Sequence, residues 1–114
     1  MIKVKRIYDG ADDGDGIRIL VDRVWPRGMT REAAAIDRWM KEVAPSSELR
    51  KWFGHDPAKW DLFRARYARE LDGQAESIRL LKEMSRKGTV TLLFGAKDTV
   101  HNNAVALKEY LESR

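Results

Sequence analysis

Residues 22–28, which read DRVWPRG, contain side chains that could bind an anion. Arginine presents a planar charged fork that matches carboxylate and phosphate groups, and a neighbouring indole can stack on a ligand ring or on a guanidinium group. We therefore predict that Arg23, Trp25 and Arg27 contact an anionic ligand. The alternative interpretation is that Arg23 pairs with a nearby acid such as Asp22 and that Trp25 belongs to the core.

A second polar segment, residues 95–103, leads into the last predicted helix. Its side chains that could bind a ligand or carry a proton are Lys97, Asp98, His101, Asn102 and Asn103. Free N–H groups and the dipole of a helix N-terminus favour an anion, and adjacent asparagines are poor helix formers. We predict that His101 transfers a proton and that the other four bind the ligand. The alternative is that Asp98 or Thr99 caps the helix and Asn103 satisfies a backbone carbonyl.

His55 is a second candidate for proton transfer. It precedes Asp56 in the sequence WFGHDP, so a carboxylate could orient its imidazole as a general base. A histidine with an unperturbed pKa of about 6.5 can change its charge near neutral pH. The alternative is that Asp56 caps a helix while His55 faces solvent.

The composition excludes several classes of site. The chain has 114 residues, no cysteine, two histidines and a net charge of +4. Disulfides, thiol nucleophiles, iron–sulfur clusters and cysteine zinc sites are therefore ruled out, and without an H-E-x-x-H motif we expect no metal. The sequence has no Walker loop, G-x-G-x-x-G or G-x-S-x-G motif, so we expect no cofactor. The loop DGADDGDG lacks the pattern of an EF-hand.

The hydropathy pattern predicts a single domain over residues 1–114. No apolar run approaches about 18 residues, and the N-terminus alternates apolar and basic residues, so we expect neither a membrane span nor a signal peptide. A cytoplasmic protein is the expectation. The predicted strands are 2–8, 17–24 and 89–94. The predicted helices are 30–43, 46–53, 57–72, 74–87 and 99–112.

These elements predict a small three-layer α/β sandwich with a mainly parallel sheet of three or more strands and about five helices. The direction of the first strand stays open, because the loop 9–16 is long for a hairpin and short for a crossover helix. Ligands of open parallel sheets bind beyond the carboxyl ends of the strands. Both polar segments follow a predicted strand, so we expect them to meet at that edge.

Three long strings of the sequence resemble one family. They are VDRVWPRG at 21–28, APSSELRKWFGHDPAKW at 44–60 and TLLFGAKDTVHNNAVALKEYL at 91–111. Together they are similar to the YeaO-like branch of the family called domain of unknown function 488, which has no agreed activity. The resemblance implies that more distant members carry a cysteine-histidine-arginine triplet after the last strand, and that a glutamate at the end of a strand precedes this triplet. The corresponding residues here are His101-Asn102-Asn103 and Lys97, so that cysteine or glutamate chemistry does not carry over.

Three functions are compatible with these features. The first is an enzyme or binding protein for an anionic small molecule that is phosphorylated or nucleotide-like. The second is a non-catalytic module that docks a protein or forms a homodimer through an exposed edge at Trp52 and Phe53. The third is nucleic-acid binding, which the isoelectric point of about 9.5 permits although no recognised motif is present.

Overall fold

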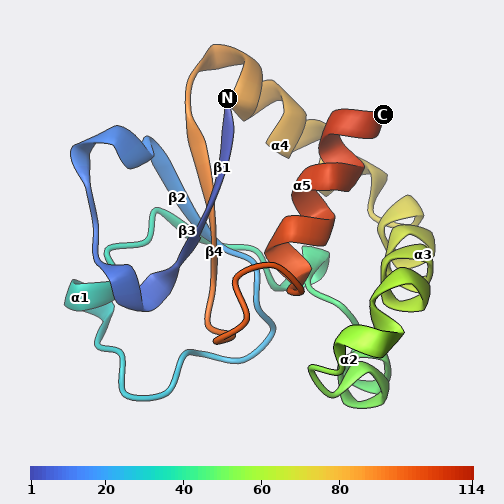
Figure 1. Cartoon of the computed structure of the whole chain (residues 1–114). Helices are drawn as coiled ribbons and strands as arrows, with labels where there is room; N and C mark the ends of the chain where they lie inside the picture. Colours follow the sequence, from blue (N-terminus) through green and yellow to red (C-terminus); the bar gives the residue numbers. More distant parts are fainter.

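Four parallel strands form one sheet in the order β1-β4-β2-β3 in this computed structural model, which describes residues 1–114 (Figure 1). The strands are β1 (Ile2–Arg6), β2 (Ile17–Leu20), β3 (Arg38–Trp39) and β4 (Val90–Phe94). All five residues of β4 are buried, as expected for a central strand covered on both faces. The α/β class with a parallel sheet is therefore confirmed. The open question about β1 is also answered: it runs parallel to β2, with β4 inserted between them.

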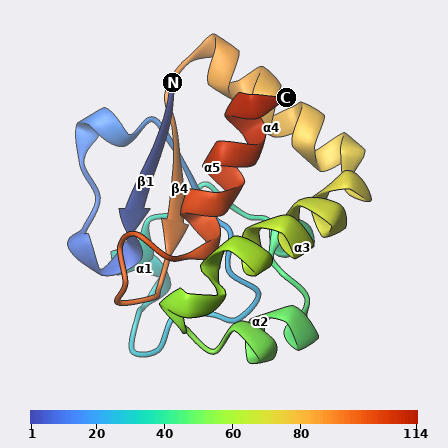
Figure 2. The same cartoon turned by 45° about the vertical axis from the view of Figure 1, so that its right-hand side comes forward.

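Five helices accompany the sheet, as the sequence predicted. They are α1 (Arg31–Ala34), α2 (Ser47–Phe53), α3 (Trp60–Asp72), α4 (Ala75–Lys87) and α5 (Asn103–Ser113). Helices α2 to α5 gather on one side of the sheet, whereas α1 lies on the other side (Figures 1 and 2). None of these helices has the length and apolar character needed to cross a bilayer.

The two faces of the sheet bury very different amounts of apolar surface. On the face of α2 to α5, the apolar side chains of Ile19 and Leu92 belong to a core cluster of 19 buried residues. Helices α3, α4 and α5 supply much of that cluster, including Phe63, Tyr67, Leu71, Ile78, Leu81, Ala104, Leu107 and Leu111. On the opposite face, a second apolar cluster has only four buried residues, and Trp25, Met29, Ile36 and Trp39 pack against them. The third layer is therefore thin and consists of α1 and loop segments.

The predicted helix over residues 30–43 is wrong. Thr30 does cap a helix by accepting the Ala33 N–H, but α1 ends after Ala34 because Ala35 adopts a left-handed conformation with φ 46°. The Arg18 guanidinium donates to the carbonyl oxygens of Ala34 and Ala35. The chain then pairs with β2 as strand β3, which the sequence analysis did not predict.

Other predicted boundaries also change. Strand β2 ends at Leu20 instead of continuing to Val24, and β1 ends at Arg6 instead of Tyr8. The last helix begins at Asn103 with Asn102 as its N-cap, so the expected cap at Asp98 or Thr99 is wrong. The predicted helix 57–72 begins as a 3-10 turn at Pro57–Lys59, and α3 starts at Trp60. The predicted ends of the helices at residues 53, 72 and 87 are confirmed.

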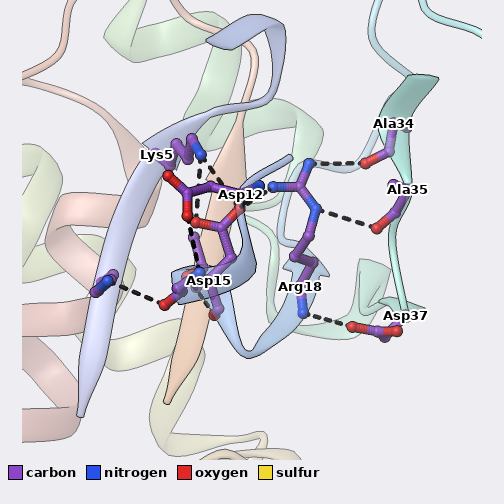
Figure 3. Close-up of polar contacts among 10 residues, drawn as sticks. Lys5, Asp12, Asp15, Arg18, Ala34, Ala35 and Asp37 are labelled. Carbon is purple, nitrogen blue, oxygen red and sulfur yellow. Dashed lines mark hydrogen bonds and ion pairs between the residues drawn. The ribbon is translucent and has the colours of Figure 1, made fainter. Parts of the chain in front are cut away.

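A buried ion pair joins the loop after β1 to the segment that contains α1 and β3 (Figure 3). Asp15 and Arg18 have side-chain exposures of only 6% each, so neither charge is solvated. Asp15 also accepts hydrogen bonds from the Lys5 ammonium and the Asp12 N–H. Burial raises the pKa of Asp15, but the hydrogen bonds from Lys5, Arg18 and Asp12 together hold it below its ordinary value.

Replacing the charge of Asp15 should strongly destabilise the fold. In the variant Asp15→Asn, Arg18 and Lys5 would lose their shared anion, and a cation left unpaired in the interior costs about 3–5 kcal/mol. Urea denaturation should show this loss. The matched control is Asp13→Asn, because Asp13 is exposed in the same turn and should change stability by less than about 0.5 kcal/mol. Equal midpoints for the two variants would show that the buried pair contributes nothing.

Gly16 lies where the chain passes closest to the start of β4. Its φ is +64°, and a Cβ atom there would come within 2.1 Å of the Thr89 carbonyl oxygen. Gly10 also has a positive φ, +82°, but no atom lies near the position of its Cβ. A substitution at Gly10 therefore measures the backbone strain alone, without the steric clash expected at Gly16. We expect Gly10→Ala to cost about 1–3 kcal/mol from strain alone and Gly16→Ala to cost more. Thermal unfolding of both variants measures the difference, and an equal loss would contradict the steric argument.

Candidate functional site

A pocket of about 490 Å³ opens at the carboxyl ends of β1, β2 and β4. Tyr8 follows β1, residues 22–27 follow β2, and Gly95 and Ala96 follow β4; all of these line the pocket. Figure 2 shows the loop between β4 and α5 beside the carboxyl end of β1. The other lining residues are Pro45, Arg50, Phe53, His55, Phe63, Asn102 and Asn103. Parallel strands therefore bring together segments that are far apart in the sequence.

Asp22 is a fixed carboxylate in this pocket. Its Oδ2 accepts the Gly95 N–H at 2.9 Å, and its Oδ1 accepts the Asn103 side-chain amide at 3.0 Å. Burial raises the pKa of Asp22 above its ordinary value, although these two hydrogen bonds and the charges of Arg50 and His55 oppose the rise. A partly desolvated carboxyl group in a cleft is a frequent feature of functional sites.

Asp22, Gly95 and Arg50 are pocket residues that were not among the predicted site residues. The sequence predicts for Asp22 only an ion pair with Arg23. The available signal was its position, because Asp22 is the first charged residue after the apolar stretch of β2. Arg50 offered no such signal, since it reaches the pocket from α2, which no strand-end rule selects.

Arg23 anchors the chain that enters α2. Its Nε donates to the Pro45 carbonyl at 3.1 Å, and its guanidinium also donates to the Ala44 carbonyl at 3.3 Å. It forms no ion pair with Asp22, so that alternative interpretation is wrong. Arg23 still lines the pocket, but its guanidinium is partly engaged by backbone.

Trp25 is half-buried and lies between the pocket and the thin layer on the second face. Its ring meets Trp39 edge-on with centroids 5.3 Å apart, and its N–H donates to the Met29 carbonyl at 2.7 Å. The Trp39 N–H in turn donates to the Asp22 backbone carbonyl at 2.7 Å. Trp25 therefore combines a packing role with a position in the pocket wall.

Arg27 and Arg50 are the pocket arginines whose guanidinium groups have no hydrogen-bond partner within the protein, unlike Arg23. Both are exposed, and neither forms an ion pair or a side-chain hydrogen bond within the protein. The backbone carbonyl of Arg27 accepts a hydrogen bond from the Tyr8 hydroxyl at 2.8 Å, which ties its turn to the end of β1. His55 adds a further basic residue to the pocket lining, on a left-handed backbone with φ 57°.

Only some of the predicted site residues in the segment 95–103 lie in the pocket. Asn102 and Asn103 line the pocket, whereas Lys97, Asp98 and His101 do not. Asn103 also donates to the Val21 carbonyl at 3.0 Å, which confirms its expected bond to backbone. Lys97 is exposed to solvent.

His101 is held outside the pocket by two neighbours. Its Nδ1 lies 2.9 Å from the Asp98 carboxylate, and its ring packs edge-on against Trp60 with centroids 5.4 Å apart. Backbone N–H groups of His101 and Val100 and the His101 ring lower the pKa of Asp98 to about 2. These contacts organise the turn before α5.

The exposed edge expected at Trp52 and Phe53 is not present. Phe53 is buried and stacks on Phe63 with centroids 4.3 Å apart. Trp52 is half-buried, and the cations of Lys59 and Arg66 lie over its ring at 5.2 and 4.3 Å. The prediction failed because α2 turns these aromatic residues toward α3.

The two carboxyl groups near α5 should titrate on opposite sides of the ordinary value of 3.8. Carbon-detected NMR should give Asp22 a higher pKa because of burial, and Asp98 a pKa of about 2 because of its N–H donors. The ionised form of Asp22 therefore destabilises the folded protein. This destabilisation is lost, and the free energy of unfolding rises, as the pH falls through the folded-state pKa of Asp22. Asp98 contributes stability above its unfolded pKa and loses it as pH falls towards 2. Equal pKa values would contradict the described burial and bonding.

Comparisons with known proteins give a family without an assigned activity. The family described as "Inactive DUF488-N3 subclade" matches residues 1–114. The uncharacterized protein YeaO of Escherichia coli (strain K12) is 43% identical over 112 residues, which cover 98% of this chain and 97% of that protein. An uncharacterized protein of Mycobacterium tuberculosis (strain H37Rv) is 35% identical over 113 residues, covering 99% of this chain and 95% of that protein. No solved structure matches. The family resemblance is thus confirmed, and the chain belongs to the inactive DUF488-N3 subclade.

Proposed function

We propose that this protein binds a small anionic ligand in the pocket at the carboxyl ends of β1, β2 and β4. The observation that carries the proposal is the pair Arg27 and Arg50, which line the pocket without any ion-pair partner. Arginine forks that are free of internal partners can donate charge-assisted hydrogen bonds to an anion. Arg27 comes from the turn after β2 and Arg50 from α2, so the ligand would lie between two separate elements.

The surroundings of the two arginines support the same conclusion. His55 lies at the rim and can donate a hydrogen bond, while the first turn of α5 places Asn102 and Asn103 in the pocket wall. The first N–H groups of a helix lack intrahelical partners and favour negative charge. The pocket volume of about 490 Å³ lies within the ordinary range for small-molecule sites.

Binding without chemical turnover is the form of this function that we favour. The description of the family as inactive supports it. His101, which the sequence analysis expected to transfer a proton, is bonded to Asp98 outside the pocket. His55 remains the pocket residue that could move a proton, and its role here is that of a hydrogen-bond donor to the anion.

Inorganic phosphate is the simplest probe of this proposal. Titration followed by NMR should shift the backbone signals of the residues that surround the pocket. Arg27→Gln and Arg50→Gln should each weaken binding by roughly tenfold or more, because a hydrogen bond to a charged group is worth about 1.5–3 kcal/mol. The matched control is Arg79→Gln, since Arg79 is exposed on α4 and outside the pocket.

The control variant separates a specific site from general attraction to a basic protein. A specific pocket predicts that Arg79→Gln binds phosphate as the unchanged protein does. If all three variants weaken binding equally, or if no pocket signal moves, the proposed function is wrong.

A further inference from the structure

The pocket contains a negative group as well as the two free arginines. The carboxylate of Asp22 lines the same cavity as Arg27 and Arg50. A bare anion placed between the arginines would therefore face a carboxylate across a partly desolvated space, where like charges repel strongly. A ligand that fills the whole pocket must therefore bind favourably to the arginines and also to the carboxylate of Asp22.

Asp22 retains the capacity to accept further hydrogen bonds. An ionised carboxylate offers about four acceptor sites on its two oxygens. Gly95 and Asn103 occupy one site on each oxygen, and no other side chain donates to them. Leaving an acceptor that faces a binding pocket without a donor is costly once a ligand excludes water. The ligand must therefore bring its own donor.

The charge of the pocket restricts what that donor can be. Arg50 and His55 act electrostatically on Asp22, and Arg27 lines the same pocket. An ammonium group on the ligand would meet these cations. A neutral hydroxyl group donates to a carboxylate without adding charge, so it fits both the acceptor and its surroundings.

The remaining wall can contact the carbon skeleton that links the two polar groups. Trp25, Pro26 and Phe53 contribute apolar surface to the cavity. A volume of about 490 Å³ is large enough for a compound of several carbon atoms in addition to its anionic group. Two arginines from separate elements suit a phosphate, whose several oxygens can accept from both.

We propose that the pocket selects a phosphorylated polyol, with Arg27 and Arg50 donating to the phosphate and Asp22 accepting a hydrogen bond from a hydroxyl group of the same ligand. This inference rests on the proposed function and adds a specificity-determining residue to it. It assigns Asp22 a direct contact with the ligand in addition to its bonds to Gly95 and Asn103.

Two matched compounds test the proposal on the unaltered protein. Glycerol 3-phosphate and n-propyl phosphate share a phosphate ester and a three-carbon chain, but only the first carries hydroxyl groups. Isothermal titration near neutral pH should give glycerol 3-phosphate an affinity higher by roughly tenfold or more, as expected for a hydrogen bond to a charged acceptor. Equal affinities for the two compounds would overturn the proposal.

The variant Asp22→Ala should remove the discrimination. It should weaken the binding of glycerol 3-phosphate by a larger factor than the binding of n-propyl phosphate, because only glycerol 3-phosphate loses a hydrogen bond to the carboxylate. Asp13→Ala is the control, since Asp13 is exposed and outside the pocket. If Asp22→Ala does not fold, equal affinities of the two compounds for the unaltered protein would still overturn the proposal.

The same measurements distinguish a failure of the role proposed for Asp22 from a failure of the anion site itself. Equal affinities that both fall in Arg27→Gln and Arg50→Gln would reject the role of Asp22 and leave an anion site intact. Affinities that do not depend on either arginine would reject the anion site itself. Discrimination that survives in Asp22→Ala would assign the hydroxyl contact to another residue and contradict the proposal.

Discussion

The buried pair of Asp15 and Arg18 is the interaction on which the amino-terminal half of the fold depends. Three segments meet there: the loop after β1, the strand β2, and the chain from α1 to β3. Two charges removed from water are tolerated only when their hydrogen-bonding groups are satisfied, and here Lys5, Asp12, Ala34 and Ala35 supply the partners. In the thin third layer, these polar contacts add to a small apolar cluster of four buried residues.

A second carboxylate performs a related task at the opposite end of the strands. Asp22 follows β2, Gly95 follows β4 and Asn103 begins α5, so two hydrogen bonds to one side chain tie three elements together. The same bonds orient the carboxylate in the wall of the pocket. Asp22 therefore both joins these elements and contributes a polar group to the pocket, which gives a structural reason for an acid in a pocket proposed to bind an anion.

Local patterns predicted much of this arrangement. The apolar stripe of Phe63, Tyr67 and Leu71 and the apolar stretch of β4 were recognisable because burial repeats with the period of the element. The rule that ligands lie beyond parallel strand ends correctly brought Arg27 and Asn103 to one pocket.

The failures came from interactions between distant segments. Strand β3 has two residues, too few for a period, and the end of α1 depends on Arg18 reaching the carbonyls of Ala34 and Ala35. Strand order has a further consequence for synthesis. Ile2 and Ile17 both pair with Val90, so two early strands emerge from the ribosome long before the strand that separates and bonds them. β1 has no strand partner and β2 has only the two residues of β3 until residues 90–94 have been made, so the four-stranded sheet can form only after most of the described residues are available.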